Sequence, residues 1–442
     1  MVCQNCEELQ KEIQRLNEEN AQLREENAQL KRRLMFYENP HTPPSRRRYP
    51  TTPPHSHNLG KRFPGRPRGH PGKTRPAPKP DVVEKPEWEN CPHCGAHLSE
   101  PSHVRHHIVE EISNPSPKTV IDFLEFEGRC DRCGEYVAAR HPDCPPEGRF
   151  GKNLYVQTTL MKFEDRLPIQ KVGWALERQH GISLTPATIL DLTRRVSDWL
   201  RPEYERILKI IRCADVVYAD ETGAKVDGRR YWTWVFTTPS ETLIAIRKSR
   251  GKKVLEEILG ENFEGVIVCD GWKSYLNFTH RIQRCWSHLL REAEYLAESI
   301  AEAKPLSEAL HELYYHIKDL PRDRPPPEVM ANLVEDARRT MNYWVKKTYE
   351  TEEVRKFAAK IRNGADHWFT FLTTPGVEPT NGRAERALRE CVIQRKIIGT
   401  FRNGKGTRTY ETIMTVLATW KQQGLNLYKA LAENLTKAWV KS

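Results

Sequence analysis

Two apolar runs in the sequence each end at an aspartate. Asp220 closes the run VVYAD and Asp270 closes the run VIVCD, and both runs have the composition of buried β-strands. If the two strands lie side by side, the carboxylates meet at one end of the sheet, where like charges repel each other unless a cation is present. Oxygen ligands without histidine favour Mg²⁺ or Mn²⁺ over zinc. The adjacent Glu221 is interpreted as a structural or supporting residue.

A third carboxylate occurs in a helix-like segment nearer the C-terminus. Within NGRAERALRECV, Glu385 lies among small and apolar residues that can face a sheet. Glu390 is the alternative, five residues on and off that face, and a solvated charged helix would produce the same letters. The basic residues of this region are candidates for gripping phosphate beside the acids: Arg383, Arg386, Arg389, Arg395 and Lys396.

The elements around the aspartates follow a recognisable order. Three β-like runs separated by short turns precede a helix and the strand that carries Asp270. This β-β-β-α-β order opens a ribonuclease-H-like α/β domain. The chain then turns mainly helical and charged, from about residue 292 to 373, and two helix-like segments close it after residue 406.

Leucines recur at every seventh position near the N-terminus. They run from Leu9 to Leu30, and Asn20 and Asn27 occupy the companion positions. This heptad pattern predicts a coiled coil over residues 6–37, and the asparagines favour a parallel dimer. We therefore expect a homodimer or a higher oligomer, with a monomeric amphipathic helix as the alternative.

The segment 38–80 is rich in proline and strongly basic. Between His41 and Pro80 it has ten Lys or Arg residues and no acid, so it holds most of the net charge of +11. Such a composition forms no packed core and favours a polyanionic partner. Within it, GRPRG resembles an AT-hook, which predicts that Arg66 and Arg68 enter a DNA minor groove. A solvated tether with nonspecific phosphate affinity is the alternative.

Two C-x2-C pairs predict a structural zinc site in the segment 81–145. Each pair is followed by a glycine, as a tight turn around a metal requires. Four cysteines leave no open coordination position, so this metal is not expected to be catalytic. The predicted ligands are Cys91, Cys94, Cys130 and Cys133.

Residues 150–212 have a helical pattern. Thr185 is a candidate cap and Pro186 a first helical residue, and the flanking segments resemble a helix-turn-helix. Two packed helices without groove contact are the alternative. No apolar run is long enough to span a bilayer, so we expect a soluble, cytoplasmic protein.

The motifs ADETGAKVDGRRYWTWVF, VCDGWKSY, RCWSHLLRE and NGRAERALRECVIQRKIIGTFRNGKG resemble those of insertion sequence 66 family transposases. The order of the predicted segments is also similar to that family's, although Gly382 stands where a second asparagine is expected. The resemblance implies a multidomain chain with an N-terminal coiled coil, a four-cysteine zinc-binding domain and a ribonuclease-H-like catalytic domain that carries a helical insertion. The expected boundaries are 6–37, 38–80, 81–145, 150–212, 213–405 with the insertion at about 292–373, and 406–442.

The resemblance further implies a DDE transposase whose acidic triad is Asp220, Asp270 and Glu385. Two Mg²⁺ or Mn²⁺ ions held there would support cleavage at the element ends and joining of the 3′-OH to target DNA. His288 is expected to support the site or contact DNA, and small accessory proteins are possible partners by family likeness. The rivals are a dimeric zinc-containing DNA-binding regulator and a ribonuclease-H-like nuclease without strand transfer.

Overall fold

The computed structural model describes residues 14–16, 18–20, 22–23, 26, 96–97, 118–123, 126–129, 132–133, 136–139, 141–323 and 325–440. The described residues between 14 and 26 are helical and exposed. The rest of the predicted coiled coil and the linker with Arg66 and Arg68 lie outside the described residues. So do the predicted zinc ligands Cys91, Cys94 and Cys130.

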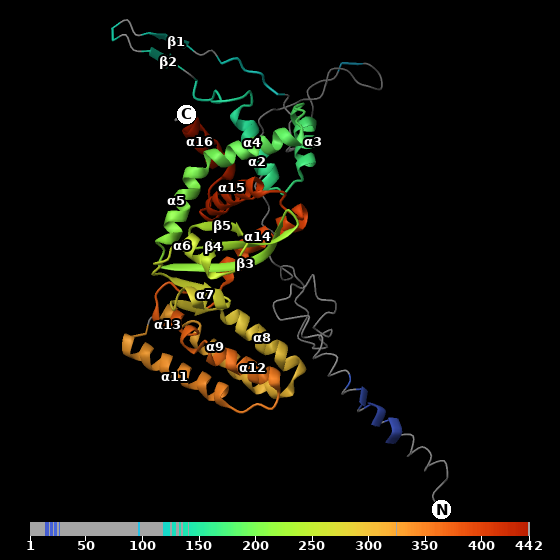
Figure 1. Cartoon of the computed structure of the whole chain (residues 1–442), viewed down its shortest axis with the longest axis vertical. Coiled ribbons are helices and arrows are strands. Elements are labelled where there is room, and N and C mark those ends of the chain that lie inside the picture. The colour runs from blue at the N-terminus through green and yellow to red at the C-terminus, as the bar shows by residue number, and fades with distance from the viewer. Residues whose placement is uncertain are drawn as a thin grey trace, which may run out of the picture.

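A five-stranded mixed sheet forms the centre of the described chain (Figure 1). Its strand order is β5-β4-β3-β6-β7, with β3 antiparallel to β4, β4 antiparallel to β5, and β3, β6 and β7 parallel to one another. The order predicted from the sequence is therefore present. The strands are β3 Val216–Val226, β4 Arg229–Thr237, β5 Thr242–Arg247, β6 Val266–Cys269 and β7 Ile282–Arg284.

The hairpin between β3 and β4 is closed by the dipeptide Asp227-Gly228. Both residues have positive φ, 52° for Asp227 and 69° for Gly228. A two-residue turn with positive φ at both positions matches the right-handed twist of the strands, and Asp-Gly tolerates it at low cost. This turn sets the register that pairs Asp220 with Val235.

The two faces of the sheet belong to two hydrophobic cores. In β3, Val217 and Ala219 are buried in one core, whereas Tyr218 is buried in the other. A sheet covered on both faces has apolar residues at successive positions rather than a strict alternation, as the run VVYA shows.

The first core is covered by helices from both ends of the described chain. The C-terminal α15 packs on β5 and also contacts α4 and α5, so segments distant in sequence share one interior. Buried side chains that include Tyr155, Leu192 and Trp439 belong to it. The helices are α2 Lys152–Phe163, α4 Pro186–Trp199, α5 Arg201–Arg212, α6 Lys252–Leu259, α7 Lys273–Phe278, α15 Gly404–Gln422 and α16 Leu427–Val440. The helix α3 Ile169–His180 packs on α2 and α4 in a separate small cluster.

The second core lies between the sheet and the helices that follow β7, at the opposite end of Figure 1. Trp286, at the centre of this core, is fully buried, and its indole N–H donates to the carbonyl of Trp368 at 2.7 Å. The helices are α8 Trp286–Ser299, η2 Ala301–Ala303, α9 Lys304–Ile317, α10 Leu320–Asp323, α11 Pro327–Lys346, α12 Glu352–Arg362, η3 Ala365–His367 and α13 Thr370–Thr373. The chain then returns to the sheet through α14 Gly382–Ile398.

A separate two-stranded sheet precedes these domains. Its strands, β1 Phe126–Arg129 and β2 Tyr136–Ala139, pair antiparallel across the segment that contains CDRCG. Of the four predicted zinc ligands only Cys133 is among the described residues, where it lies exposed in a turn. The zinc site therefore stays a prediction.

Candidate active site

The register of two parallel strands brings Asp220 and Asp270 together. Tyr218 of β3 is paired with Val268 of β6. Asp220 lies two residues beyond Tyr218, and Asp270 lies two residues beyond Val268, just past the end of β6. Because parallel neighbours advance in step, the two carboxylates sit side by side where the β3–β6 pairing ends. The sequence placed Asp220 at the end of its strand, but β3 continues past it to Val226 in its pairing with β4. The side chain of Asp270 is 27 % exposed, and Asp220 is half-buried, so a ligand can approach from solvent.

The turn after β6 holds Asp270 in place. Its Oδ1 accepts a hydrogen bond from the backbone N–H of Trp272 at 2.8 Å. Gly271 between them has a φ of +86°, a conformation that strongly favours glycine. A side chain there would also come within 2.9 Å of Arg284 Nε. The dipeptide Asp270-Gly271 is thus required by the local backbone as well as by the site.

Glu385 approaches Asp220 from the first turn of α14. Asn381, which precedes this helix, is fully buried, and its Nδ2 donates to the carbonyl of Ala219 at 2.8 Å. That carbonyl belongs to the residue before Asp220, so the bond ties the start of α14 to the strand that carries the first acid. Sequence reasoning missed this role of Asn381, although an asparagine just before a helix is a recognisable signal.

The apolar face of α14 lies against β3 and β4, with Ala384, Leu388 and Cys391 buried. Glu390 lies away from the aspartates. Its carboxylate accepts two hydrogen bonds from Arg166, at 2.6 and 2.7 Å. Glu390 is therefore an ion-pair partner, and Glu385 is the acid that the structure brings to Asp220 and Asp270.

The electrostatics of the site show strong repulsion among carboxylates. Burial raises the pKa of Asp220 well above its usual range, and the carboxylates of Glu221, Asp270 and Glu385 raise it further. Only the backbone N–H of Glu221, which donates to Asp220 Oδ1 at 2.9 Å, opposes this trend. A cation bound among these oxygens would relieve the repulsion.

Glu221 points into a buried polar cluster beside the acids. Its carboxylate accepts hydrogen bonds from Tyr275 Oη at 2.5 Å and from Arg250 Nε at 2.6 Å, and its side chain is fully buried. Burial raises the pKa of Glu221, and the nearby Asp270 raises it further. The interpretation of Glu221 as a supporting residue fits this position.

Arg250 connects this buried cluster to the acidic site. Its guanidinium carbon lies 4.8 Å from the ring centroid of Trp232 and 4.0 Å from that of Trp272, so the group is held between two aromatic rings. Its Nη2 is 3.9 Å from Asp270 Oδ2. Arg250 therefore compensates Glu221 directly and approaches Asp270 at the same time. The sequence alone offered no signal for this contact.

His288 lies behind Glu385. Its Nδ1 is 3.5 Å from Glu385 Oε1, and its side chain is 14 % exposed. Burial lowers the pKa of His288 to about 4, so the imidazole is neutral near pH 7. A neutral ring can support the carboxylate or bind a metal, and it adds no charge to the site.

The predicted phosphate-binding residues of α14 and its C-terminal end fall into two groups. Arg383 pairs with Glu378 at 2.6 Å, and Arg395 donates hydrogen bonds to Thr222 Oγ1 at 2.9 Å and to the carbonyl of Gly223. These two arginines have structural partners within the fold. The other three are exposed: Arg386, Arg389 and Lys396.

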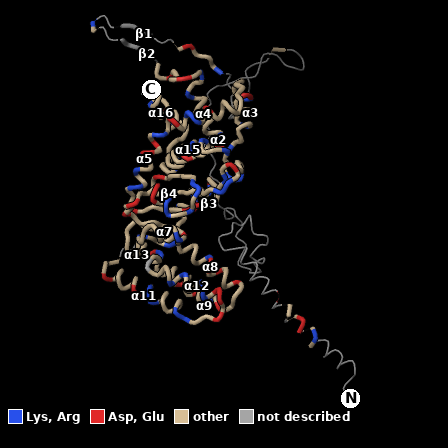
Figure 2. The backbone as a smooth tube through the Cα atoms, viewed as in Figure 1, with Lys and Arg blue, Asp and Glu red and all other residues tan. Residues whose placement is uncertain are grey.

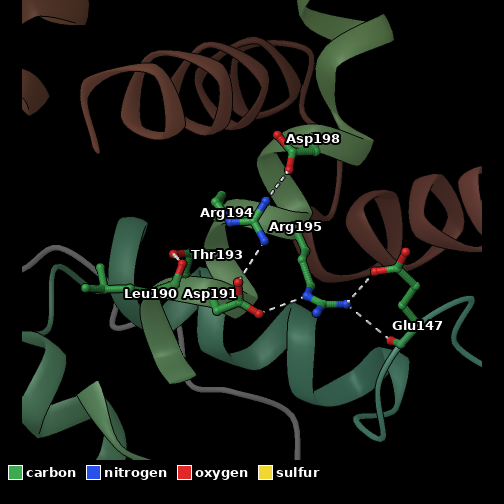
Figure 3. A network of polar contacts seen from close by, with 7 residues as sticks. All are labelled: Glu147, Leu190, Asp191, Thr193, Arg194, Arg195 and Asp198. Carbon is green, nitrogen blue, oxygen red and sulfur yellow. Dashed lines mark hydrogen bonds and ion pairs between the residues drawn. The ribbon is translucent and has the colours of Figure 1, made fainter. Parts of the chain in front are cut away.

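The helix α4, which resembles the second helix of a helix-turn-helix, has its arginines paired (Figure 3). Thr185 caps it by accepting the Thr188 N–H at 3.2 Å, and Pro186 is its first residue, both as predicted. Arg194 contacts Asp191 at 2.8 Å and Asp198 at 3.0 Å. The opposite face of α4 packs on α2, α3, α15 and α16. The helix-turn-helix-like segment and its alternative of packed helices both stay predictions.

Basic and acidic residues are interspersed along the described backbone (Figure 2). Many of them form ion pairs within the same helix, such as Arg201 with Glu205 at 3.1 Å. The described part of the chain has no helix that is both long and apolar enough to cross a membrane.

A mixed α/β sheet with Asp220 and Asp270 side by side on its neighbouring parallel strands is compatible with the catalytic domain of a transposase. The model of the family described as "Transposase IS66 family" matches residues 147–409, which is more than half of the chain. The chain belongs to this transposase family, and the resemblance predicted from its motifs is confirmed. Membership in this family implies that the protein acts on DNA.

Two curated relatives come from Sinorhizobium fredii (strain NBRC 101917 / NGR234). The uncharacterized protein y4jD is 23 % identical over 406 residues, which cover 81 % of this chain and 76 % of the relative. The uncharacterized protein y4qI is 22 % identical over 324 residues, which cover 65 % of this chain and 59 % of the relative. Neither relative has a name that states an activity.

Proposed function

We propose that this transposase is a DDE enzyme in which Asp220, Asp270 and Glu385 hold divalent cations. It cuts DNA at the ends of its insertion sequence and joins the freed 3′-OH to target DNA. The observation that carries the proposal is the β3–β6 register, which sets Asp220 beside Asp270. The bond from Asn381 to Ala219 supports it, because that bond brings the start of α14 to the same place.

The donor set fits Mg²⁺ or Mn²⁺. The three acids supply hard oxygen ligands, and the raised pKa of Asp220 reflects burial and repulsion that a cation would offset. When bound, two such ions activate a water or hydroxyl for attack on a phosphodiester and stabilise the departing oxygen. No serine or tyrosine nucleophile is required for this chemistry.

The chain's own residues orient the acids and position DNA. Trp272 N–H fixes one oxygen of Asp270, Asn381 anchors the helix of Glu385, and the neutral His288 borders that carboxylate. The exposed Arg386 and Arg389 lie on the same helix as Glu385, so they are placed to bind phosphates next to the reacting strand.

The N-terminal segments extend the proposal on sequence patterns alone. A parallel coiled coil over residues 6–37 would pair two chains and thereby two element ends. Zinc held by the four cysteines and minor-groove contacts of Arg66 and Arg68 would contribute DNA affinity. Family likeness also allows small accessory proteins as partners.

The test is cleavage and joining of DNA that carries the native element ends, with Mg²⁺ or Mn²⁺ and a target plasmid. Asp270→Asn should abolish both products. Asp227→Asn is the matched control, because it makes the same change in the exposed β3–β4 turn, and asparagine also tolerates positive φ. Cuts without joined products would favour the nuclease, and tight DNA binding without cuts under either metal would favour the regulator.

A further inference from the structure

Three side chains of different metal-binding type meet at the edge of the proposed active site, and one of them is the proposed catalytic acid Glu385. Cys285 follows β7 and caps α8, His288 lies on the first turn of α8, and Glu385 lies on the first turn of α14. Within the described residues, the Cys285 Sγ, a ring nitrogen of His288 and a carboxylate oxygen of Glu385 all lie within 4.8 Å of one another.

The spacing of these atoms suits a small tetrahedral ion. Bonds of about 2.0–2.3 Å at tetrahedral angles place neighbouring ligand atoms about 3.3–3.8 Å apart. The distance from His288 Nδ1 to Glu385 Oε1 is 3.5 Å, which lies inside that range. The Cys285 Sγ lies within 4.8 Å of the other two ligand atoms, so it must move toward them by about 1 Å at most to reach this spacing.

The inner carboxylate oxygen of Glu385 gives an independent indication of a missing ligand. Glu385 Oε1 is buried and accepts no hydrogen bond in the structure. A buried carboxylate oxygen without a donor is costly, and a bound cation would supply the missing interaction. The side chain of Glu385 as a whole is 36 % exposed, so an ion can enter from that side.

The two helix starts that carry these ligands are held together directly. The backbone N–H of Asn381 donates to Cys285 Sγ at 3.2 Å, so the sulfur already contacts the segment that positions Glu385. Cys285 is 1 % exposed, and burial raises the pKa of its thiol to about 11. The thiol is therefore protonated in the absence of a metal, and an entering ion must displace one proton from sulfur.

We propose that Cys285, His288 and Glu385 form a second metal site that binds Zn²⁺ or a similar soft divalent ion, distinct from the Mg²⁺ or Mn²⁺ positions between the acids. One thiolate and one carboxylate balance the charge of the ion, and a mixed sulfur, nitrogen and oxygen set selects zinc over magnesium. Since three protein ligands are present, a fourth position stays open to water.

Occupancy of this site has a consequence that rests on the proposed function. Glu385 would turn one oxygen toward the soft ion and lose freedom to bind the hard cations opposite Asp220. Zn²⁺ should therefore inhibit Mg²⁺-dependent cleavage at concentrations that fill the site. Metal binding at this site can be measured without DNA and without cleavage. A failure of the metal-site proposal can therefore be told apart from a failure of the proposed transposase activity.

The test is a Co²⁺ titration of the full-length, metal-free protein without DNA, followed through the sulfur-to-cobalt charge-transfer absorption. Wild-type protein should show a component of this band that is missing from Cys285→Ser, a variant that keeps an acceptor for the Asn381 N–H. Cysteines elsewhere contribute equally to both proteins, so the difference spectrum reports Cys285. Cys391→Ser is the matched control, because Cys391 is also buried but lies outside the cluster, and its spectrum should equal that of wild type.

A second variant keeps the sulfur in place. His288→Asn should weaken Co²⁺ binding at least tenfold while leaving Cys285 available. No band in wild-type protein, or a band that persists unchanged in Cys285→Ser, overturns the site. A cleavage assay then compares each variant with its own zinc-free rate, and loss of zinc sensitivity in Cys285→Ser is the expected result.

Discussion

Asn381→Ala isolates the contact that places Glu385. The Asn381 side chain is fully buried and donates to the Ala219 carbonyl, next to Asp220. It makes no capping hydrogen bond to α14, so the substitution removes the tie to β3 without removing a helix cap. Any loss of activity then reports the position of the helix relative to the strand.

The expected effects on stability and on rate differ in size. Loss of the hydrogen bond lowers the free energy of unfolding by about 0.5–1.5 kcal/mol, and by up to about 3 kcal/mol if the carbonyl of Ala219 stays buried without a donor. A displacement of about 1 Å at a reacting group costs on the order of 10²-fold in rate. Asn381→Ala should thus fold and bind DNA but cleave roughly a hundredfold more slowly.

The assay pairs single-turnover cleavage of element-end DNA with urea unfolding. Asn403→Ala is the control, since Asn403 caps α15 by accepting the Gly406 N–H at 2.8 Å. Loss of that cap costs about 1 kcal/mol, but it leaves the acids untouched and the rate unchanged. Equal loss of rate in both variants, or a rate for Asn381→Ala within about twofold of wild type, would refute the reasoning.

Three further predictions follow from the same contacts. Asp220→Asn should raise the melting temperature of metal-free protein at neutral pH and not near pH 4. The pKa of Asp220 is raised in the folded state, so ionisation of this acid lowers the free energy of unfolding more and more as the pH rises above about 4, the pKa of an aspartate in the unfolded chain. Melting in EDTA across pH checks this, and a lower melting temperature at pH 7 contradicts it. Arg250→Met should destabilise the protein by about 2–3 kcal/mol by leaving Glu221 buried and unpaired, discounted for the 28 % exposure of Arg250. Denaturant midpoints measure this, and Glu221→Gln in the same chain should restore most of the loss. Arg389→Gln should reduce the slope of log binding constant against log salt by about 1. Arg194→Gln should leave that slope unchanged because its guanidinium already pairs with two carboxylates, and equal slopes for both variants would remove Arg389 as a phosphate contact.

Local patterns in the sequence were enough to predict much of the catalytic domain. Apolar runs of strand length predicted β3 and β6. The same runs identified Asp220 and Asp270 as the acids that directly follow them. The dipeptide Asp227-Gly228 predicted the tight turn between β3 and β4. Thr185 and Pro186 predicted the start of α4. These features depend on residues close together in the chain, so they could be predicted without the fold.

Contacts between distant segments could be decided only by the tertiary structure. The sequence of α14 allowed either Glu385 or Glu390 to face Asp220 and Asp270. The ion pair of Glu390 with Arg166 shows that Glu390 faces elsewhere. The contact of Arg250 with Glu221 and the meeting of Cys285 with Glu385 join segments that no sequence period connects. Spacing in the sequence thus indicated which residues are candidates for the chemistry, whereas packing decided which of them meet, because side-chain partners depend on how distant elements dock.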